Sequence, residues 1–319
     1  SLMLNGHLDT VPPYSMIIPA YKPIIKNGYI QGRGVVDMKG SLAAMILAIV
    51  LVKRANVELA GNLYFTGVID QEQRSFGTVN LIEKGIKTDF AVVGEPTNLK
   101  ICKAHKGMEW IKIVVKGKSA HGSTPEKGYN TIYHASRIAN EIEKFNNELK
   151  EKANKVVGHS TINVGVISGG NDPNIVPNVT TLEIDRRYTH EEKREKLYNE
   201  IEKIIARLKA SHSEYQTEVI PMNDRICPLG NLPFYTEDNN KLYDSLTNSV
   251  KKYTDNDAEI TSFRGWSDAA LLENELGINS AIFGPGLTEK CHAADEKLKV
   301  SELVKAVKIY VSLIIDICT

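Results

Sequence analysis

Short apolar strands alternate with helices at the start of this chain, and that alternation limits its fold more than any other feature. Residues 62–70 and 90–94 have the length and composition of buried strands, residues 1–10 open as another strand, and residues 39–54 form a predicted helix. Elements in this order predict a mainly parallel sheet with helices on both faces, which is the α/β class.

The pattern changes near residue 106 and changes back near residue 221. The segment between these points is typical of a small α+β sandwich, with strands predicted at 108–117, 160–170 and 178–188 and helices at 130–149 and 190–210. The simplest account is an insertion. We therefore predict an α/β domain built from residues 1–105 and 221–319, interrupted by a sandwich of residues 106–220.

The composition favours a cytoplasmic protein with a small-molecule partner. Lysine and arginine together number 39, as do aspartate and glutamate, so no net field attracts nucleic acid or an anionic membrane. The four cysteines are widely spaced, which indicates reduced thiols, and no basic leader precedes the first strand. The longest apolar run, residues 42–52, is shorter than the roughly 20 residues of a membrane span and predicts a buried helix.

Acids and histidines stand at or just beyond the ends of the predicted strands: His7, Asp37, Glu72, Glu95 and His292. Because the ligand crevice of an open α/β sheet lies outside the carboxyl ends of its strands, we expect these side chains to converge. Two imidazoles and three carboxylates suit zinc, with cobalt or manganese as alternatives. One shared carboxylate would let five ligands serve two ions.

Each of these residues also has an ordinary structural interpretation. His7 with Asp9 could form a capped turn before two prolines, Glu95 could be a loop acid, and Asp37 could cap the helix that begins at residue 39. Taken one by one, these interpretations are favoured. It is the set of residues, in this order along the chain, that points to a metal site.

The motifs NGHLDT, GRGVVDMKG, IDQEQ, VVGEPT and EKCHAADE, with a domain inserted before the last, closely resemble those of the aminoacylase, acetylornithine deacetylase and succinyl-diaminopimelate desuccinylase family of dinuclear zinc hydrolases. The resemblance covers essentially the whole chain. It implies a zinc-exopeptidase-like catalytic domain and an inserted lid that also forms a homodimer. The implied activity is that of a deacylase or exopeptidase acting on N-acylated amino acids or small peptides.

The resemblance also implies a role for each residue of the centre. Asp37 would bridge two ions, each completed by one histidine and one glutamate: His7 with Glu95, and His292 with Glu72. Asp9 matches a carboxylate that braces the site without binding metal. Since it lies two residues after His7 on an extended chain, its side chain points the same way.

Gln71 departs from the family pattern at the position of the general base. The pattern is Asp-Glu-Glu with a glycine seven residues after the aspartate, and Asp70 with Gly77 fixes that register, so that Glu72 falls on the metal ligand. In the family, the glutamate before that ligand takes a proton from the attacking water and passes it to the leaving nitrogen, which an amide cannot do. We expect severe but incomplete loss of turnover, with metal binding retained.

Several hypotheses about Gln71 stay open. It could be a substitution made to trap a substrate, a natural loss of the chemistry, or a position whose work another residue does. The function would then be that of an impaired dinuclear zinc amidohydrolase, or of a non-hydrolytic protein of the same fold that binds metal and an acylated amino acid or dipeptide. A third hypothesis, a purely structural dimer, requires no metal.

The inserted segment carries candidates for substrate binding. His121 resembles the lid histidine that reaches the partner subunit's active site and polarises the scissile carbonyl, and Asn174 and Arg187 match residues that hold the carbonyl and the substrate carboxylate. Strand parity favours Arg187 over Arg186, because Arg186 shares its face with apolar residues. The alternatives are a helix-entry loop for His121 and a surface ion pair with an acid of the same strand for Arg187.

Two further expectations come from the resemblance. The turn at residues 284–286 looks like the family's substrate loop, and Gly286 could offer its backbone amide to a substrate carboxylate. The family also has several tens of residues before its His-x-Asp strand. Without them, we expect an exposed sheet edge and exposed apolar surface.

Overall fold

The computed structural model describes residues 1–14, 16–254 and 257–319. These residues form two compact units. One consists of Ser1–His105 with Phe234–Thr319, and the other consists of Lys106–Pro233. In the sequence, the second unit therefore interrupts the first.

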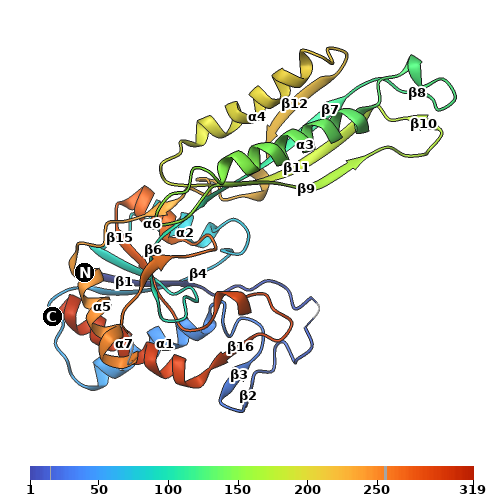
Figure 1. The fold of residues 1–319 in the computed structure, drawn as a ribbon. Coiled ribbons are helices and arrows are strands. Elements are labelled where there is room, and N and C mark those ends of the chain that lie inside the picture. Colours follow the sequence, from blue (N-terminus) through green and yellow to red (C-terminus); the bar gives the residue numbers. More distant parts are fainter. Residues whose placement is uncertain (15, 255–256) are drawn as a thin grey trace. The chain divides into compact units, whose positions relative to one another are not determined.

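A seven-stranded, mainly parallel sheet lies at the centre of the first unit (Figure 1). β1 (Leu2–His7) pairs in parallel with β4 (Leu63–Val68) and with β5 (Phe90–Val93), and β15 (Asn279–Ile282) continues the parallel order beyond β5. The other strands are β6 (Ile101–His105), β13 (Phe234–Tyr235) and β14 (Ile260–Ser262). The sheet confirms the predicted α/β class.

Helices cover both faces of this sheet because its strands are apolar on both sides. Leu2 and Leu4 of β1 pack into one cluster of buried side chains, and Met3 between them packs into another. The first face carries α1 (Lys39–Arg54), α5 (Lys241–Thr254) and α7 (Val300–Cys318), and the second carries α2 (Phe76–Glu83) and α6 (Ala269–Leu276) (Figure 1). No helix among the described residues is both long and apolar enough to cross a membrane.

One edge of the sheet and one side of α1 are open to solvent. β4 is the last strand in the sheet order, and its Tyr64 is 38% exposed. On α1, which the sequence predicted to be buried, Ile46, Leu47 and Leu51 are 42–47% exposed. The expected exposed edge and apolar surface are therefore present, and α1 is buried on one side only.

A small antiparallel sheet, which the sequence did not predict, joins two distant segments of the first unit. β3 (Tyr29–Gln31) pairs with β2 (Ile24–Lys26) and with β16 (Lys297–Lys299). Strands of three residues are too short for their alternation to reveal them. Their pairing holds the segment before Asp37 against the segment after His292.

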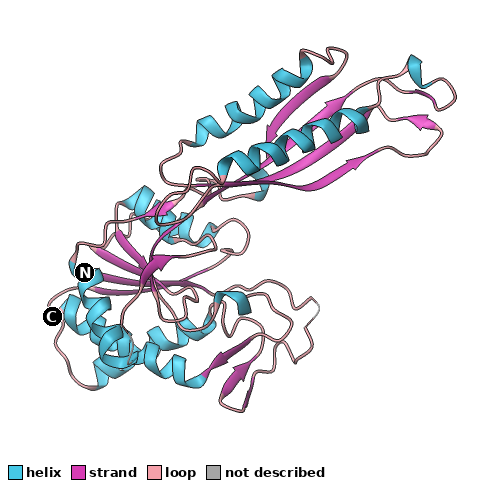
Figure 2. Cartoon of the chain, viewed as in Figure 1, coloured by secondary structure: helices cyan, strands magenta, loops and turns pink. Residues whose placement is uncertain are grey.

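The second unit is a sheet with two helices on one face (Figure 2). The strands follow the antiparallel order β12 (Gln216–Pro221), β7 (Gly107–Lys116), β11 (Val179–Tyr188) and β9 (Thr161–Gly169). The helices are α3 (Thr131–Leu149) and α4 (Arg194–Lys209), whose apolar sides pack on the sheet. A separate pair, β8 (Ala120–His121) and β10 (Ile175–Val176), extends this unit. Short 3-10 helices occur at Pro125–Lys127 and Asn223–Arg225, and in the first unit at Thr288–Lys290.

The second unit ends later than predicted. We placed its end at residue 220, but residues 221–233 also belong to it. Met222 donates its backbone N–H to the Trp110 carbonyl at 3.0 Å, and Met108 donates to the Asn231 carbonyl at 2.8 Å. These bonds hold residues 221–233 against β7. The sequence of this segment has no periodicity that would predict the pairing.

We expect Ile184→Ala on β11 to destabilise the second unit by about 2–5 kcal/mol, because the side chain is 2% exposed and its truncation leaves a cavity under the helices. Val166→Ala is the matched control. Val166 lies on β9 on the open face and is 48% exposed, so its truncation should cost under about 0.5 kcal/mol. Equilibrium urea unfolding measures both, and equal costs would contradict the assignment of the covered face.

Candidate metal centre

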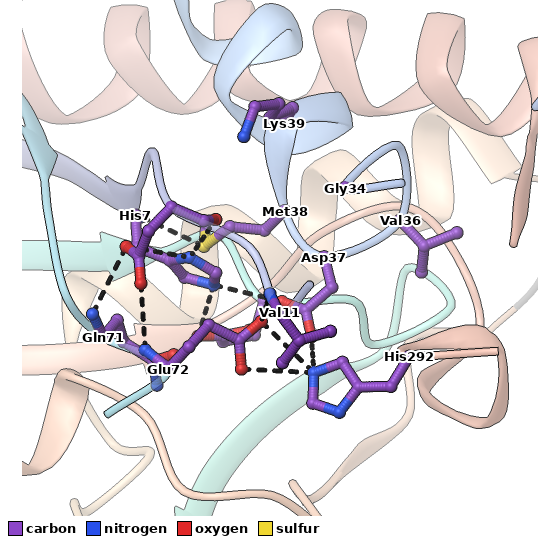
Figure 3. Close-up of polar contacts among 12 residues, drawn as sticks. His7, Val11, Gly34, Val36, Asp37, Met38, Lys39, Gln71, Glu72 and His292 are labelled. Carbon is purple, nitrogen blue, oxygen red and sulfur yellow. Dashed lines mark hydrogen bonds and ion pairs between the residues drawn. The ribbon is translucent and has the colours of Figure 1, made fainter. Parts of the chain in front are cut away.

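The residues predicted as metal ligands come together at one end of the first unit's sheet. His7 ends β1, Glu72 follows β4, Glu95 follows β5, and His292 lies beyond β15. All four leave the carboxyl ends of parallel strands, where the ligand crevice of such a sheet is expected. Asp37 comes from the loop directly before α1, and Figure 3 shows its carboxylate between the two imidazoles.

Asp37 faces one histidine with each oxygen. Its Oδ1 lies 3.1 Å from Nε2 of His7, and its Oδ2 lies 3.2 Å from Nε2 of His292. Ligand atoms of His7, Asp37 and Glu72 lie within 4.8 Å of one another. The helix-cap alternative for Asp37 does not hold, because the residue that precedes α1 is Met38 and no side chain caps that helix.

Each histidine also has a glutamate beside it. Both carboxylate oxygens of Glu72 lie 3.2 Å from Nε2 of His292, and Oε1 of Glu95 lies 4.0 Å from Nε2 of His7. The result is two imidazole–carboxylate pairs that share Asp37. Nitrogen and carboxylate ligands in this number suit two borderline divalent cations such as zinc.

Glu95 provides the clearest sign that a cation fits. Its side chain is 4% exposed, and among the described residues its Oε1 has no hydrogen-bond partner. Burial raises the pKa of this carboxyl well above its ordinary value, and the neighbouring Asp37 adds to the rise. A buried carboxylate oxygen without a partner is poorly stabilised, and a metal ion beside His7 would supply the missing positive charge.

In the metal-free protein, protons on the histidines supply part of that charge. Hydrogen bonds with Asp37 and Glu72 raise the pKa of His292 to about 10. Burial opposes a charge on His7, but hydrogen bonds with Asp37 and Asp9 outweigh it and raise its pKa well above the usual range. At neutral pH a metal would therefore have to displace protons from both imidazoles.

Asp9 braces both sides of the centre. Its carboxylate accepts the backbone N–H groups of Gln71 and Glu72 at 3.3 and 3.1 Å, and its Oδ1 lies 3.5 Å from Nδ1 of His7. Burial alone would raise the pKa of Asp9, but the bonds with His7 and the Glu72 amide outweigh it and lower the pKa to about 2. Asp9 thus stays charged and orients one histidine and one glutamate of the centre.

Gln71 is held beside the centre by two hydrogen bonds. Its side-chain Nε2 donates to the Trp266 carbonyl at 3.2 Å, and its backbone N–H donates to Asp9. Gly77, which set the register of this motif, has no room for a side chain, since a Cβ there would lie 2.3 Å from the Ile69 nitrogen. The close backbone approach explains the glycine at that position.

Two of the predicted substrate residues lie at one end of the second unit. His121 is on β8 and Asn174 directly precedes β10, which pairs with it. The Asn174 carbonyl accepts the N–H of Gly122 at 2.6 Å, and Nδ1 of His121 lies 2.7 Å from the Ser123 hydroxyl. Both predicted residues are exposed.

Arg187 lies on the open face of β11, as strand parity predicted. Arg186 is fully buried on the helix-covered face. Nε of Arg187 donates to one Asp185 oxygen at 2.8 Å, and its Nη2 donates to the other at 3.0 Å. This is the ion pair that we considered as the alternative, so Arg187 would have to leave Asp185 to grip a substrate.

The backbone amides of the predicted substrate turn are engaged within the chain. Gly286 donates its N–H to the Glu302 carboxylate at 3.2 Å, and Gly284 donates to the Thr97 hydroxyl at 3.1 Å. Gly286 has φ +96°, which favours glycine. The amide of Gly286 therefore binds a carboxylate, but it is that of Glu302 and not of a substrate. In this conformation neither glycine of the turn has a backbone N–H free for a substrate.

Two buried acids near the centre were not assigned a role from the sequence. Asp268 is 1% exposed and accepts the Thr78 hydroxyl at 2.7 Å, and burial raises its pKa despite that bond. Glu296 is fully buried. It belongs to the same motif as His292, but the sequence gives no sign of what its side chain contacts.

Comparison with known proteins agrees with this geometry. The model of Peptidase family M20/M25/M40 matches residues 3–316. The chain is 30% identical to an uncharacterized metallohydrolase of Methanocaldococcus jannaschii, over 98% of this chain and 80% of that protein. It is 25% identical to a probable succinyl-diaminopimelate desuccinylase of Staphylococcus epidermidis, over 97% and 81%. The family resemblance drawn from the motifs is confirmed.

The fold has a close counterpart among solved structures. Aminopeptidase PepT from Bacillus cereus superposes with a TM-score of 0.77 at 23% identity, covering 99% of this chain and 80% of that one. At this identity the likeness concerns the fold. It supports the mainly parallel sheet with an inserted second unit.

We expect metal binding to release protons and the metal affinity to rise with pH through the neutral range. His292 has a pKa of about 10 in the metal-free protein and must lose its proton to become a ligand. Calorimetric titration with Zn²⁺ at pH 7, in two buffers of different ionisation heat, counts the protons released, and we expect about two per protein, one from each imidazole. A binding heat that does not depend on the buffer would contradict the raised pKa.

Proposed function

Because the chain belongs to peptidase family M20/M25/M40, whose members are metal-dependent hydrolases, we propose that it is a dinuclear amidohydrolase for N-acylated amino acids or small peptides. Asp37 and the two imidazole–carboxylate pairs beside it would hold two ions, and we propose zinc, with cobalt and manganese as alternatives. Hydrolysis in this chain is impaired because Gln71 stands where the general base belongs.

The position of Asp37 between two imidazoles is the main support for a dinuclear centre. The two oxygens of Asp37 lie at hydrogen-bond distance from two different imidazoles, and each imidazole has a second carboxylate beside it. A mononuclear centre has no need of the second imidazole–carboxylate pair. Divalent ions in place of the two imidazole protons would satisfy every carboxylate of the group, including the bare Oε1 of Glu95.

The chain's own residues position the ligands and the reacting groups. Asp9 fixes His7 through its ring and Glu72 through its backbone N–H. The metal ions would supply Lewis-acid activation of water and of the scissile carbonyl. Gln71 is held beside the ligands by its backbone bond to Asp9, but its amide cannot carry a proton from water to the leaving nitrogen.

The substrate class is supported by the relatives and by the chemistry of the site. One relative is named as a desuccinylase and one structural neighbour as an aminopeptidase, and both names describe cleavage of an amide bond at an amino acid nitrogen. The neutral overall charge does not select a strongly charged polymer. We therefore propose a small N-acylated amino acid or short peptide.

The placement of residues in the second unit supports a homodimer. Arg187 pairs opposite Met108 at one end of β7, whereas His121 follows the other end, near Lys116. Eight residues of strand separate these ends, which is about 26 Å. Within one copy, His121 and Arg187 cannot contact the same small substrate. We propose that His121 and Asn174 serve the active site of the partner subunit.

A second candidate function is a binding protein of the same fold that does not hydrolyse its ligand. The observation that favours it is the bond from Nε2 of Gln71 to the Trp266 carbonyl. A glutamine donates to that carbonyl, whereas a charged glutamate would place two oxygens against each other. The surroundings of Gln71 in this chain therefore accommodate the amide.

The two candidates are separated by Gln71→Glu. If the scaffold is otherwise intact, the restored base should raise the hydrolysis rate by about 10²- to 10⁴-fold, because general acid–base help has that magnitude. The measurement is the steady-state rate of amide cleavage over a panel of N-acetyl and N-succinyl amino acids and dipeptides, with the metal content of each sample determined.

Gln73→Glu is the matched control. Gln73 is exposed, lies two residues further along and gains the same charge, so its rate should stay at that of the parent chain. No gain in Gln71→Glu, with both ions bound, would show that Gln71 does not occupy the base position and would favour the binding protein.

A further inference from the structure

Glu296 makes the densest set of hydrogen bonds to the loop that carries Asp37. The carboxylate is fully buried, and it accepts from one guanidinium and three backbone N–H groups of that loop: Arg33 Nη1 at 2.6 Å, Gly34 at 3.1 Å, Val36 at 2.9 Å and Asp37 at 3.3 Å. The two partners are about 260 residues apart in the sequence. Both carboxylate oxygens are occupied, so Glu296 is not available as a ligand.

Two backbone hydrogen bonds also hold the loop, from Arg33 N–H to the Ala20 carbonyl at 2.9 Å and from Lys39 N–H to the Gly34 carbonyl at 2.8 Å, but the N–H groups of its central residues bond to Glu296. No side chain caps α1, which begins directly after Met38. Gly34 has φ +80°, and a Cβ there would lie 2.5 Å from Thr10, so the loop is tightly turned and close-packed. Backbone N–H groups in such a turn need a partner when buried, and the Glu296 carboxylate is that partner for three of them.

Glu296 belongs to the segment that carries His292, and this segment is joined to the Asp37 loop by further contacts. Glu296 follows His292 by four residues and is followed directly by β16, which pairs with β3 just before the loop. The Glu296 carbonyl also accepts the N–H of Gly32 at 3.3 Å. The segment after His292 and the loop before Asp37 are therefore joined through main chain and side chain together.

We propose that Glu296 is a positioning residue that sets the separation between Asp37 and His292, and with it the geometry of the ion these two residues share. This inference rests on the proposed dinuclear centre. Glu296 acts through Asp37: it aligns the backbone from which the bridging carboxylate projects, and it ties that backbone to the chain that carries a ligand of the second ion. Ligand-supporting groups of this kind typically change metal affinity about 10- to 100-fold when they are replaced.

The test is Glu296→Gln. Glutamine keeps the size of the side chain and one acceptor oxygen, but its NH₂ group faces two of the four donors, either Arg33 and Gly34 or Val36 and Asp37, and leaves that pair without an acceptor. Titration of the metal-free protein with Co²⁺, followed by visible absorption, reports both affinity and coordination geometry. We expect the affinity of the more weakly held ion to fall about 10- to 100-fold and its absorption bands to change.

Glu273→Gln is the matched control. Glu273 is a partly buried carboxylate of the first unit that also accepts a backbone N–H, that of Ser280, but Ser280 lies toward the amino-terminal end of β15, away from the ligands. Its Co²⁺ spectrum and affinity should equal those of the parent chain. Circular dichroism and thermal unfolding of the metal-free proteins establish that each variant is folded.

The outcomes separate the inference from the proposed function. A parent chain that binds no Co²⁺ would overturn both. A parent that binds two ions, with Glu296→Gln equal to it in affinity and spectrum, would overturn the role of Glu296 alone. If Glu296→Gln does not fold, Glu296→Asp is measured instead: it keeps the charge beside Arg33 but is shorter by one methylene, so unchanged Co²⁺ binding there would equally overturn the inference.

Discussion

The proposed metal centre depends on the carboxylate of Asp37, which faces His7 with one oxygen and His292 with the other. The parallel sheet brings the other ligands to it from the ends of separate strands. Such a gathering of carboxylates is costly to bury. In the metal-free protein it is offset in part by protons on the two imidazoles, while Oε1 of Glu95 has no hydrogen-bond partner among the described residues. Divalent ions would neutralise the carboxylate charge that the imidazole protons offset only in part.

Binding and turnover are separate properties of this centre. The ligands and the Asp9 brace do not use the Gln71 side chain, which points its amide to the Trp266 carbonyl instead. Replacing a base by an amide removes proton transfer but no ligand. The same metal site can therefore belong to an impaired hydrolase or to a protein that only binds. We propose that the second unit acts across two copies, because Arg187 lies beside one end of β7 and His121 follows the other end.

Local patterns in the sequence predicted the elements that have a clear period. The helix expected at residues 39–54 begins and ends at Lys39 and Arg54, and the parity of β11 separates Arg186 from Arg187 as expected. Asp37 comes from the loop before α1, whereas the convergence of His7, Glu72, Glu95 and His292 followed from their positions after strands. The contacts of Glu296 and the engaged amide of Gly286 did not, because each joins segments whose side chains meet only after folding. The end of the second unit was misplaced for the same reason: irregular backbone pairs with β7 there.

The most direct measurement of the central claim is a crystal structure of the chain grown with zinc, with diffraction recorded on both sides of the zinc absorption edge. We predict two anomalous peaks, about 3.5–4 Å apart, with Asp37 between them, one beside His7 and Glu95 and the other beside Glu72 and His292. A single peak, peaks that do not touch Asp37, or no peak at saturating zinc would contradict it.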